Sequence, residues 1–217
     1  MLSLLAAEWA CAAAVMALLW LWHLRLRNAR VADAGLTGLI AAFAIADARL
    51  GHGFGPRRAA IAFMMGSWGL RLMVNLLYVR VFGRQEDERY AALRARWGQL
   101  ANGRFFWLFQ ALAVLAAVGS LPALIASMNG AQDFSPIEFA AAGLWIVAFA
   151  GETTADRQRL HFQSNPANAG ATCRKGLWRY SRHPNCWFDG LAWVAYALFA
   201  FASTQLTTSV FDPWLRR

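Results

Sequence analysis

The chain has 217 residues, of which 59% are hydrophobic and only 15% charged, with 11 Trp and 15 Phe. This composition excludes an ordinary soluble domain, because the apolar residues occur in long blocks instead of alternating with polar ones. The formal net charge of +9 does not indicate nucleic-acid binding, since the basic residues cluster between the apolar blocks and no RNA- or DNA-binding motif accompanies them.

The apolar blocks predict an all-α fold, a polytopic integral membrane bundle of about six transmembrane helices. Crossing the hydrocarbon core takes about 20 helical residues, and a helix satisfies its own backbone polar groups there. No internal repeat or second domain is visible, so we expect a single transmembrane domain over residues 1–217. The expected spans, in chain order, are residues 2–24, 34–50, 59–82, 105–127, 135–151 and 186–203.

Two polar connections interrupt the apolar blocks. In the first, residues 83–104, the side chains Tyr90, Leu93 and Trp97 recur at helical spacing, which predicts a short amphipathic helix on the membrane surface. The second connection covers residues 152–185. Both are rich in arginine, whereas the connection between the fourth and fifth spans has no basic residue. The positive-inside rule therefore predicts that both lie in the cytoplasm and that the N-terminus lies outside.

The three cysteines do not indicate a metal site. Cys11, Cys173 and Cys186 lie far apart in the sequence and match no metal-ligand spacing. We expect buried or incidental thiols at these positions and no bound metal.

The cytoplasmic end of the fifth span carries one half of a candidate site. A stripe at alternating three- and four-residue steps is apolar within the membrane and charged at its surface. Glu152 and Asp156 share a helix face, and Arg159 can reach Asp156. A solvated helix end with a local ion pair explains these residues equally well, since an exposed pair contributes under about 1 kcal/mol. The members of the stripe are Trp145, Phe149, Glu152, Asp156, Arg159 and Gln163.

The other half of the candidate site is the block GLWRYSRHPN at residues 176–185. Pro184 suits the first turn of a helix, so the sixth helix is expected to begin there with the positive end of its dipole at the cytoplasmic surface. Free backbone donors beside guanidinium groups favour a phosphate site, and a plain contact with anionic lipid is the alternative. The residues beside this helix end are Arg179, Ser181, Arg182 and His183, and the same face continues into the membrane through Asn185, Asp189, Trp193 and Tyr196.

Five sequence blocks together carry a resemblance to a known family. They resemble a bacterial membrane family of unknown function that is grouped with the steroid 5-alpha-reductases. The resemblance implies a seven-helix enzyme that reduces a carbon–carbon double bond conjugated to a ketone, with NADPH as cofactor. The blocks are RNARVAD at 27–33, WGLRL at 68–72, EDERYAALRARWG at 86–98, ADRQRLHFQSNPAN at 155–168 and GLWRYSRHPN at 176–185.

The resemblance also implies roles for individual residues. Asp33 falls near the acid that polarises the substrate ketone, Trp68 falls where the steroid enzymes place a tyrosine donor, and Tyr78 is the candidate that replaces this tyrosine. The developing enolate oxygen would be stabilised by such acid groups. The binding site of a lipophilic substrate would be lined by Trp68, Arg71, Asn75 and Trp193. NADPH would be bound by Glu152, Asp156, Arg159, Arg179, Tyr180, Ser181, Arg182, His183, Asn185 and Asp189.

The chain departs from the family pattern in three places. Cys186 and Trp187 stand where the family has Tyr-Phe, and Asp189 stands where it usually has Glu. The chain ends at FDPWLRR, where the family continues into a seventh helix and a basic tail. With six spans the C-terminus would lie outside, whereas a seventh would return it to the cytoplasm. Without the seventh helix and the tail, the protein would close less completely over the cofactor.

Two alternatives stay open beside the reductase hypothesis. The motif Arg182-His183-Pro184 is also similar to that of membrane isoprenylcysteine and phospholipid methyltransferases, which bind S-adenosylmethionine. Those enzymes have Tyr two residues after the motif, where this chain has Cys186. A non-catalytic relative that keeps the fold is the other alternative. The expected surroundings are membrane lipids of the bacterial inner membrane, and the sequence does not indicate an oligomeric state.

Overall fold

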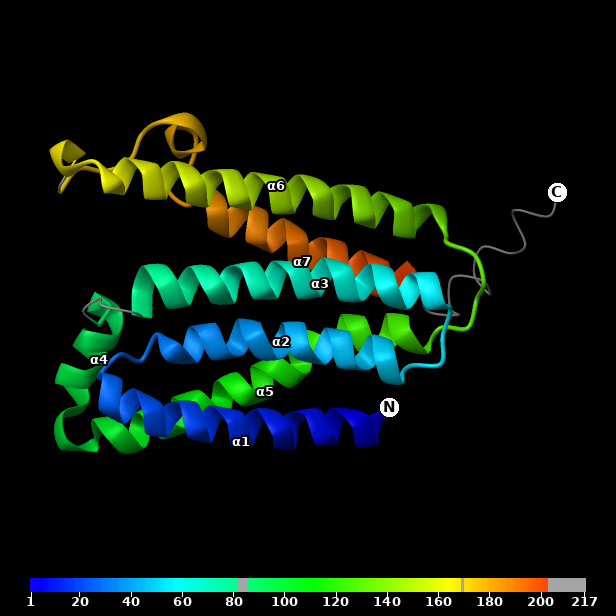
Figure 1. The fold of residues 1–217 in the computed structure, drawn as a ribbon, viewed down its shortest axis with the longest axis horizontal. Helices are drawn as coiled ribbons and strands as arrows, with labels where there is room; N and C mark the ends of the chain where they lie inside the picture. The colour runs from blue at the N-terminus through cyan, green and yellow to red at the C-terminus, as the bar shows by residue number, and fades with distance from the viewer. Residues whose placement is uncertain (82–85, 169, 203–217) are drawn as a thin grey trace. The chain divides into compact units, whose positions relative to one another are not determined.

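The computed structural model describes residues 1–81, 86–168 and 170–202, and within these residues there are helices, turns and loops but no strand (Figure 1). The expected all-α fold is therefore confirmed. The helices are α1 Leu2–Leu26, α2 Val31–Leu50, α3 Gly55–Leu76, α4 Glu88–Trp97, α5 Ala101–Met128, α6 Pro136–Ser164 and α7 Pro184–Ala202.

Four stretches of helix in the described chain are long and apolar enough to cross a membrane. This finding confirms an integral membrane fold at the first four expected spans. The helices α6 and α7 form at the fifth and sixth expected spans but are not among the four, so their crossing stays a prediction. The four stretches are Leu2–Leu26, Val31–Leu50, Gly55–Val79 and Glu88–Met128.

The boundaries of the helices follow local chemistry closely. The amphipathic helix expected in the first polar connection is α4, and Asp87 caps its first turn by accepting a hydrogen bond from the Arg89 N–H. The helix α6 runs to Ser164, well past the expected end at residue 151, because nothing in residues 152–164 interrupts a helix before Asn165 and Pro166. The helix α7 begins at Pro184 as predicted.

Some expectations fall on residues that the structure does not describe. These are residues 82–85, at the end of the third span and the start of the amphipathic connection, and residues 203–217, which include the end of the sixth span and the FDPWLRR terminus. The expectation of a missing seventh helix depends on that terminus and therefore lies outside the described residues.

The chain divides into two compact units, Met1–Gly130 and Ala131–Arg217. The expected single domain over residues 1–217 stays a prediction. In the first unit, α2 packs against α1, α3 and α5. The backbones of α2 and α3 approach closely at Gly69, where a Cβ would lie only 2.6 Å from the Thr37 carbonyl oxygen. Small residues of this kind allow helices to pack tightly in a membrane, where no hydrophobic effect drives them together.

In the second unit, α6 packs along α7. A methyl group at Gly151 of α6 would overlap the ring of Phe188 on α7, so the glycine provides the space for that ring. Nearer the start of α6, the Trp145 Nε1–H donates to the Tyr196 hydroxyl of α7 at 3.2 Å, and both side chains are buried. These contacts fix the register of the two helices and so position the charged ends that follow.

Candidate functional site

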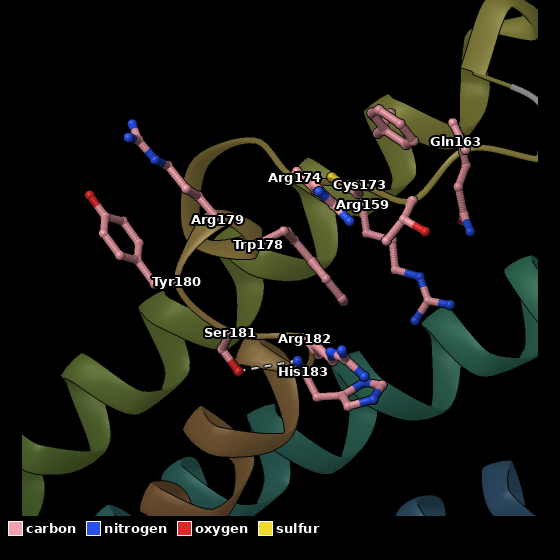
Figure 2. Close-up of a pocket in the computed structure, with 13 residues that line it drawn as sticks. Arg159, Gln163, Cys173, Arg174, Trp178, Arg179, Tyr180, Ser181, Arg182 and His183 are labelled. Carbon is pink, nitrogen blue, oxygen red and sulfur yellow. Dashed lines mark hydrogen bonds between the residues drawn. The ribbon is translucent and has the colours of Figure 1, made fainter.

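A cavity of about 740 Å³ lies in the second unit, between the last turns of α6 and the segment that leads into α7 (Figure 2). Four arginines line it, together with aromatic, hydroxyl and thiol side chains. Its lining residues are Arg159, Phe162, Gln163, Ala171, Thr172, Cys173, Arg174, Trp178, Arg179, Tyr180, Ser181, Arg182 and His183.

The segment that forms one wall of the cavity is held against α6 by two hydrogen bonds. The Trp178 indole N–H donates to the Ala155 carbonyl at 2.9 Å, and the Leu177 backbone N–H donates to the Gln158 side-chain oxygen at 2.9 Å. Gly176, which directly precedes Leu177, has a φ of 59°, a conformation that glycine adopts without strain. The wall is therefore the short 3-10 turn Gly176–Arg179, which is attached to α6 through the Trp178 indole and the Leu177 backbone N–H.

The charge of the cavity is strongly positive. Arg174, Arg179 and Arg182 are exposed, and within the described residues none of them forms an ion pair with a carboxylate. The Arg159 guanidinium lies over the Trp178 ring, 5.5 Å from its centroid. Guanidinium groups bind phosphate or carboxylate through paired hydrogen bonds, so this arrangement suits a ligand with several negative charges.

The side chains around the cavity do not all point the same way. Figure 2 shows Arg159, Arg182 and His183 on one side of the Trp178 turn, whereas Arg179 and Tyr180 project to the other. Tyr180 is 84% exposed. A ligand held between Arg159 and Arg182 would therefore not touch the Tyr180 ring in this conformation.

The start of α7 is shaped by Ser181. Its hydroxyl oxygen accepts a hydrogen bond from the His183 backbone N–H at 3.2 Å, which forms a tight turn immediately before Pro184. The turn directs the Arg182 and His183 side chains to the cavity, and the helix then begins at a residue that needs no N–H partner.

The structure brings together six of the ten residues expected to bind a cofactor. The cavity is lined by Arg159, Arg179, Tyr180, Ser181, Arg182 and His183. The other four lie along the two helices and do not line it: Glu152, which is 3% exposed, and the half-buried Asp156, Asn185 and Asp189. Whether these four bind a cofactor stays a prediction.

Sequence reasoning missed several residues of the cavity. Arg174 contributes a fourth guanidinium and Trp178 contributes both the anchor and an aromatic face. Trp178 lies inside the GLWRYSRHPN block, and Arg174 precedes Lys175 in a short basic run, so both carried a signal. What the sequence did not indicate was that residues 171–174 line the same cavity as the end of α6.

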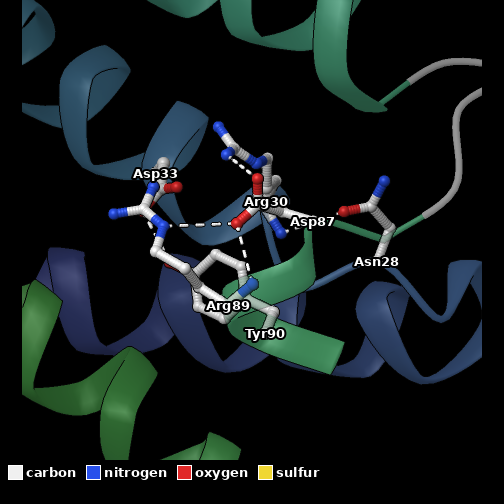
Figure 3. A network of polar contacts seen from close by, with 6 residues as sticks. All are labelled: Asn28, Arg30, Asp33, Asp87, Arg89 and Tyr90. Atoms are coloured by element: carbon white, nitrogen blue, oxygen red, sulfur yellow. Dashed lines mark hydrogen bonds and ion pairs between the residues drawn. The ribbon is translucent and has the colours of Figure 1, made fainter. Parts of the chain in front are cut away.

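A second polar site lies in the first unit, where α1 ends and α2 begins (Figure 3). Asp33 stands in the first turn of α2, and its carboxylate accepts a hydrogen bond from the Tyr90 hydroxyl of α4 at 2.8 Å. The tyrosine beside Asp33 is therefore Tyr90. Tyr78 lies on the π-helical turn Leu77–Val81 that continues α3, and it is 74% exposed. Its catalytic role stays a prediction.

Further polar contacts hold the start of α4 against the start of α2. Arg30 and Asp87 form an ion pair, and the Arg89 Nε–H also donates to Asp87 at 3.2 Å (Figure 3). Asn28 accepts a hydrogen bond from the Arg30 backbone N–H at 3.1 Å. The pair Asp33–Tyr90 therefore sits within a network of charged residues.

Glu86 is a second carboxylate of this network that accepts three hydrogen bonds. It accepts hydrogen bonds from the Arg94 guanidinium at 2.7 and 2.8 Å and from the Ala29 backbone N–H at 3.0 Å. Burial raises the pKa of the Glu86 carboxyl, but these bonds outweigh it and hold the pKa below its ordinary value. For Asp87, burial likewise opposes the bonds from Arg30 and Arg89, which again lower the pKa.

The buried His23 completes the network on the α1 side. Its Nδ1 lies 3.0 Å from the Trp20 carbonyl oxygen, which can only accept, so Nδ1 carries the hydrogen. Its Nε2 lies 3.3 Å from the Arg94 guanidinium and therefore accepts from it. This arrangement requires a neutral imidazole.

The residues expected to line a substrate lie in both units. Trp68 of α3 is buried, with 3% exposure, and Arg71 and Asn75 follow on the same helix and are half-buried. Trp193 is on α7 and packs edge-to-face on Tyr196, with ring centroids 5.6 Å apart. Their role in substrate binding stays a prediction.

The fold and the two polar sites define an all-α integral membrane protein with an arginine-lined cavity beside one of its helix ends. The chain belongs to the DUF1295 family of proteins of unknown function, whose sequence pattern matches residues 19–215. It is 28% identical over 192 residues to the uncharacterized protein C594.04c of Schizosaccharomyces pombe. That match covers 76% of this chain and 55% of the relative, so the chain spans about half the length of the relative. No solved structure matches the chain significantly.

Proposed function

We propose that this protein is a membrane-embedded reductase that uses NADPH to reduce the carbon–carbon double bond of a lipophilic enone, in the manner of the steroid 5-alpha-reductases it resembles. The observation that carries the proposal is the arginine-lined cavity of the second unit. The proposed location is the bacterial inner membrane, with this cavity on the cytoplasmic side, because the two arginine-rich connections favour that orientation.

The cavity fits the chemistry of a dinucleotide phosphate. Its volume of about 740 Å³ is within the usual range of sites for molecules of this size. NADPH carries several negative charges on its phosphates. The guanidiniums of Arg174 and Arg182, which form no ion pair among the described residues, are suited to hold them. The Trp178 ring, under Arg159, offers an apolar face for a heterocycle. When bound, NADPH supplies the hydride.

Asp33 and Tyr90 are the proposed acid groups of the reaction. Reduction of an enone develops negative charge on the ketone oxygen, and a hydroxyl donor close to that oxygen stabilises it. The Tyr90 hydroxyl, now bonded to Asp33 at 2.8 Å, takes the place of the tyrosine that the steroid enzymes have at the position of Trp68. Asp33 orients the hydroxyl and, where it is protonated, supplies a second donor.

The positive charge of the cavity favours the reductase hypothesis over the methyltransferase hypothesis. S-adenosylmethionine carries a sulfonium and an ammonium against one carboxylate, so its net charge is positive. Four arginines without described carboxylate partners repel such a ligand and attract a polyphosphate. A non-catalytic relative would keep the helices without selecting either ligand.

Nucleotide binding by the detergent-purified protein tests the proposal. NADPH, NADH and S-adenosylmethionine are titrated against wild type, the double variant Arg174→Ala/Arg182→Ala and the control Arg157→Ala. Arg157 is an exposed arginine of α6 that does not line the cavity. We expect saturable NADPH binding, weakened about tenfold or more in the double variant because charge-assisted hydrogen bonds contribute roughly 1.5–3 kcal/mol each, and unchanged in the control.

Two results would contradict the proposal. Saturable binding of S-adenosylmethionine without NADPH would favour the methyltransferase, and no binding of any of the three would favour a non-catalytic relative. Where NADPH binds, its oxidation in the presence of flat apolar enones, followed by product analysis, identifies the substrate class.

A further inference from the structure

Two acidic side chains meet inside the first unit, far from the site around Asp33. Glu8 of α1 is 8% exposed and Asp47 of α2 is 2% exposed, and both lie within stretches that can cross a membrane. Asp47 is 14 residues after Asp33 on the same helix, a separation of about 21 Å at 1.5 Å per residue. The proposed reductase activity makes no use of this pair.

The hydrogen-bond contacts around the pair favour a protonated Glu8. The Ser120 hydroxyl lies 2.7 Å from a Glu8 carboxyl oxygen and 2.8 Å from the Ala117 carbonyl oxygen. A hydroxyl has one hydrogen and a carbonyl can only accept, so a hydrogen on Glu8 is needed to satisfy both contacts fully. The Asp47 carboxyl lies within interaction range of the Glu8 carboxyl, and two carboxyl groups can share a hydrogen bond only when one of them is protonated.

No positive charge on a described residue neutralises the pair. In the described part of the chain, neither Glu8 nor Asp47 forms an ion pair with an arginine, lysine or histidine. The helix α5, which supplies Ser120, has no charged residue between 105 and 128. The basic side chains at this end of the unit contact other groups or are exposed to solvent.

Arg58 of α3 donates to the carbonyls of Ala48 and Gly51 at 3.1 and 2.5 Å and so caps the end of α2. The Arg57 guanidinium lies over the Phe54 ring, 5.7 Å from its centroid. Arg49 and His52 are exposed.

A second observation at Asp47 also indicates a neutral group. Its Oδ2 atom is fully buried and has no hydrogen-bond partner among the described residues. Leaving an ionised carboxylate oxygen buried and unpaired costs far more than leaving a protonated one. Ionisable residues within membrane helices are expensive and usually serve a function.

We propose that Glu8 and Asp47 form a proton-binding site within the membrane, which holds at least one proton between the two carboxyl groups at neutral pH. The Ser120 hydroxyl completes the site on the α5 side. The two carboxyls titrate as a coupled pair, so the proton belongs to the pair and not to either residue. Loss of the proton places two negative charges against each other between α1 and α2, where water does not screen them.

Infrared spectroscopy of the full-length protein in detergent tests this site, because the C=O stretch of a protonated carboxyl group is separate from the carboxylate bands and shifts in heavy water. We expect such a band in the wild type at pH 7, and a weaker band in the double variant Glu8→Gln/Asp47→Asn. The amides have nearly the same shape as the acids and keep the hydrogen-bonding groups, so the variant should retain its helical circular dichroism. Ser120→Ala should shift the band without removing it.

The matched control is Glu88→Gln, an exposed carboxylate in the first turn of α4. It should leave the band unchanged. A wild type without the band at pH 7, or a folded double variant whose band is as strong as that of the wild type, would overturn the proposal. Alkaline titration provides an independent readout. As the pH rises, we expect the melting temperature of the wild type to fall together with the intensity of the band. The melting temperature of the double variant should not fall in this way.

Discussion

The Tyr90 hydroxyl donates to the Asp33 carboxylate at 2.8 Å, although the two residues are 57 positions apart. The bond joins the surface helix α4 to the first turn of α2 and places a phenol beside an acid within the first unit. If the reductase proposal holds, this pair is the proposed donor for the developing enolate.

Tyr90→Phe is expected to destabilise the protein by about 1–3 kcal/mol, because it leaves the Asp33 carboxylate without its hydroxyl donor. Thermal unfolding in detergent, followed by circular dichroism, measures the effect. The control is Tyr180→Phe, which changes a tyrosine that is 84% exposed and should leave the melting temperature unaltered. Equal melting temperatures for Tyr90→Phe and wild type would show that the bond does not stabilise α4. If the reductase proposal holds, kcat also falls in Tyr90→Phe.

The stability of the first unit is expected to fall in acid because of Glu86 and Asp87. The pKa of each carboxyl lies below its ordinary value, 4.5 for Glu86 and 3.8 for Asp87, owing to hydrogen bonds that outweigh burial. A depressed pKa contributes stability that is fully present above the ordinary value and is lost as the pH falls through the folded-state value. The melting temperature should therefore be constant near neutrality and drop below about pH 4.5.

Glu86→Gln isolates the contribution of Glu86 to this effect. The variant should melt at a lower temperature than wild type at pH 7, because an amide cannot replace the paired bonds to Arg94. Its melting temperature should then change less on acidification. The exposed Glu88→Gln serves as the control and should follow the wild-type curve. An unchanged pH dependence in Glu86→Gln would remove Glu86 as its source.

Gly151→Ala is expected to weaken the packing of α6 on α7, because the added methyl group overlaps the Phe188 ring. Overpacking of this kind typically costs about 1–3 kcal/mol. Gly143→Ala is the matched change on the same helix, since a Cβ at Gly143 meets nothing within 4 Å. It should be neutral or stabilise the helix by roughly 0.5–1 kcal/mol. Thermal unfolding of both variants, and of Gly151→Ala combined with Phe188→Leu as the rescue, measures the difference.

Gln158→Ala is expected to release the wall of the cavity from α6. The variant loses the acceptor of the Leu177 N–H, so the turn Gly176–Arg179 keeps only the Trp178 bond to Ala155. Limited trypsin digestion, which cuts after Arg174, Lys175 and Arg179, should proceed faster in the variant. Gln163→Ala is the control, because Gln163 lines the cavity but has no hydrogen bond to this turn. Equal digestion rates would show that Trp178 alone holds the wall.

The amino-acid sequence by itself determined the helices. Apolar blocks of about 20 residues predict membrane helices, the spacing of Tyr90, Leu93 and Trp97 predicted α4, and Pro184 marked the start of α7. These features depend on neighbours along the chain, so they can be recognised without a tertiary structure. Arg179 and Arg182 were recognised for the same reason, since both lie in the short block at residues 176–185.

The tertiary structure decided which side chains meet. The pairs Asp33–Tyr90, Glu8–Ser120 and Ala155–Trp178 are 57, 112 and 23 residues apart in the sequence. Their contacts depend on the rotation of each helix about its axis and on its depth beside the next helix. Hydropathy reveals neither in a membrane, because the faces toward lipid and toward protein are both apolar. The proximity of Glu8 to Asp47, and of Tyr90 to Asp33, could therefore be recognised only from the packed helices.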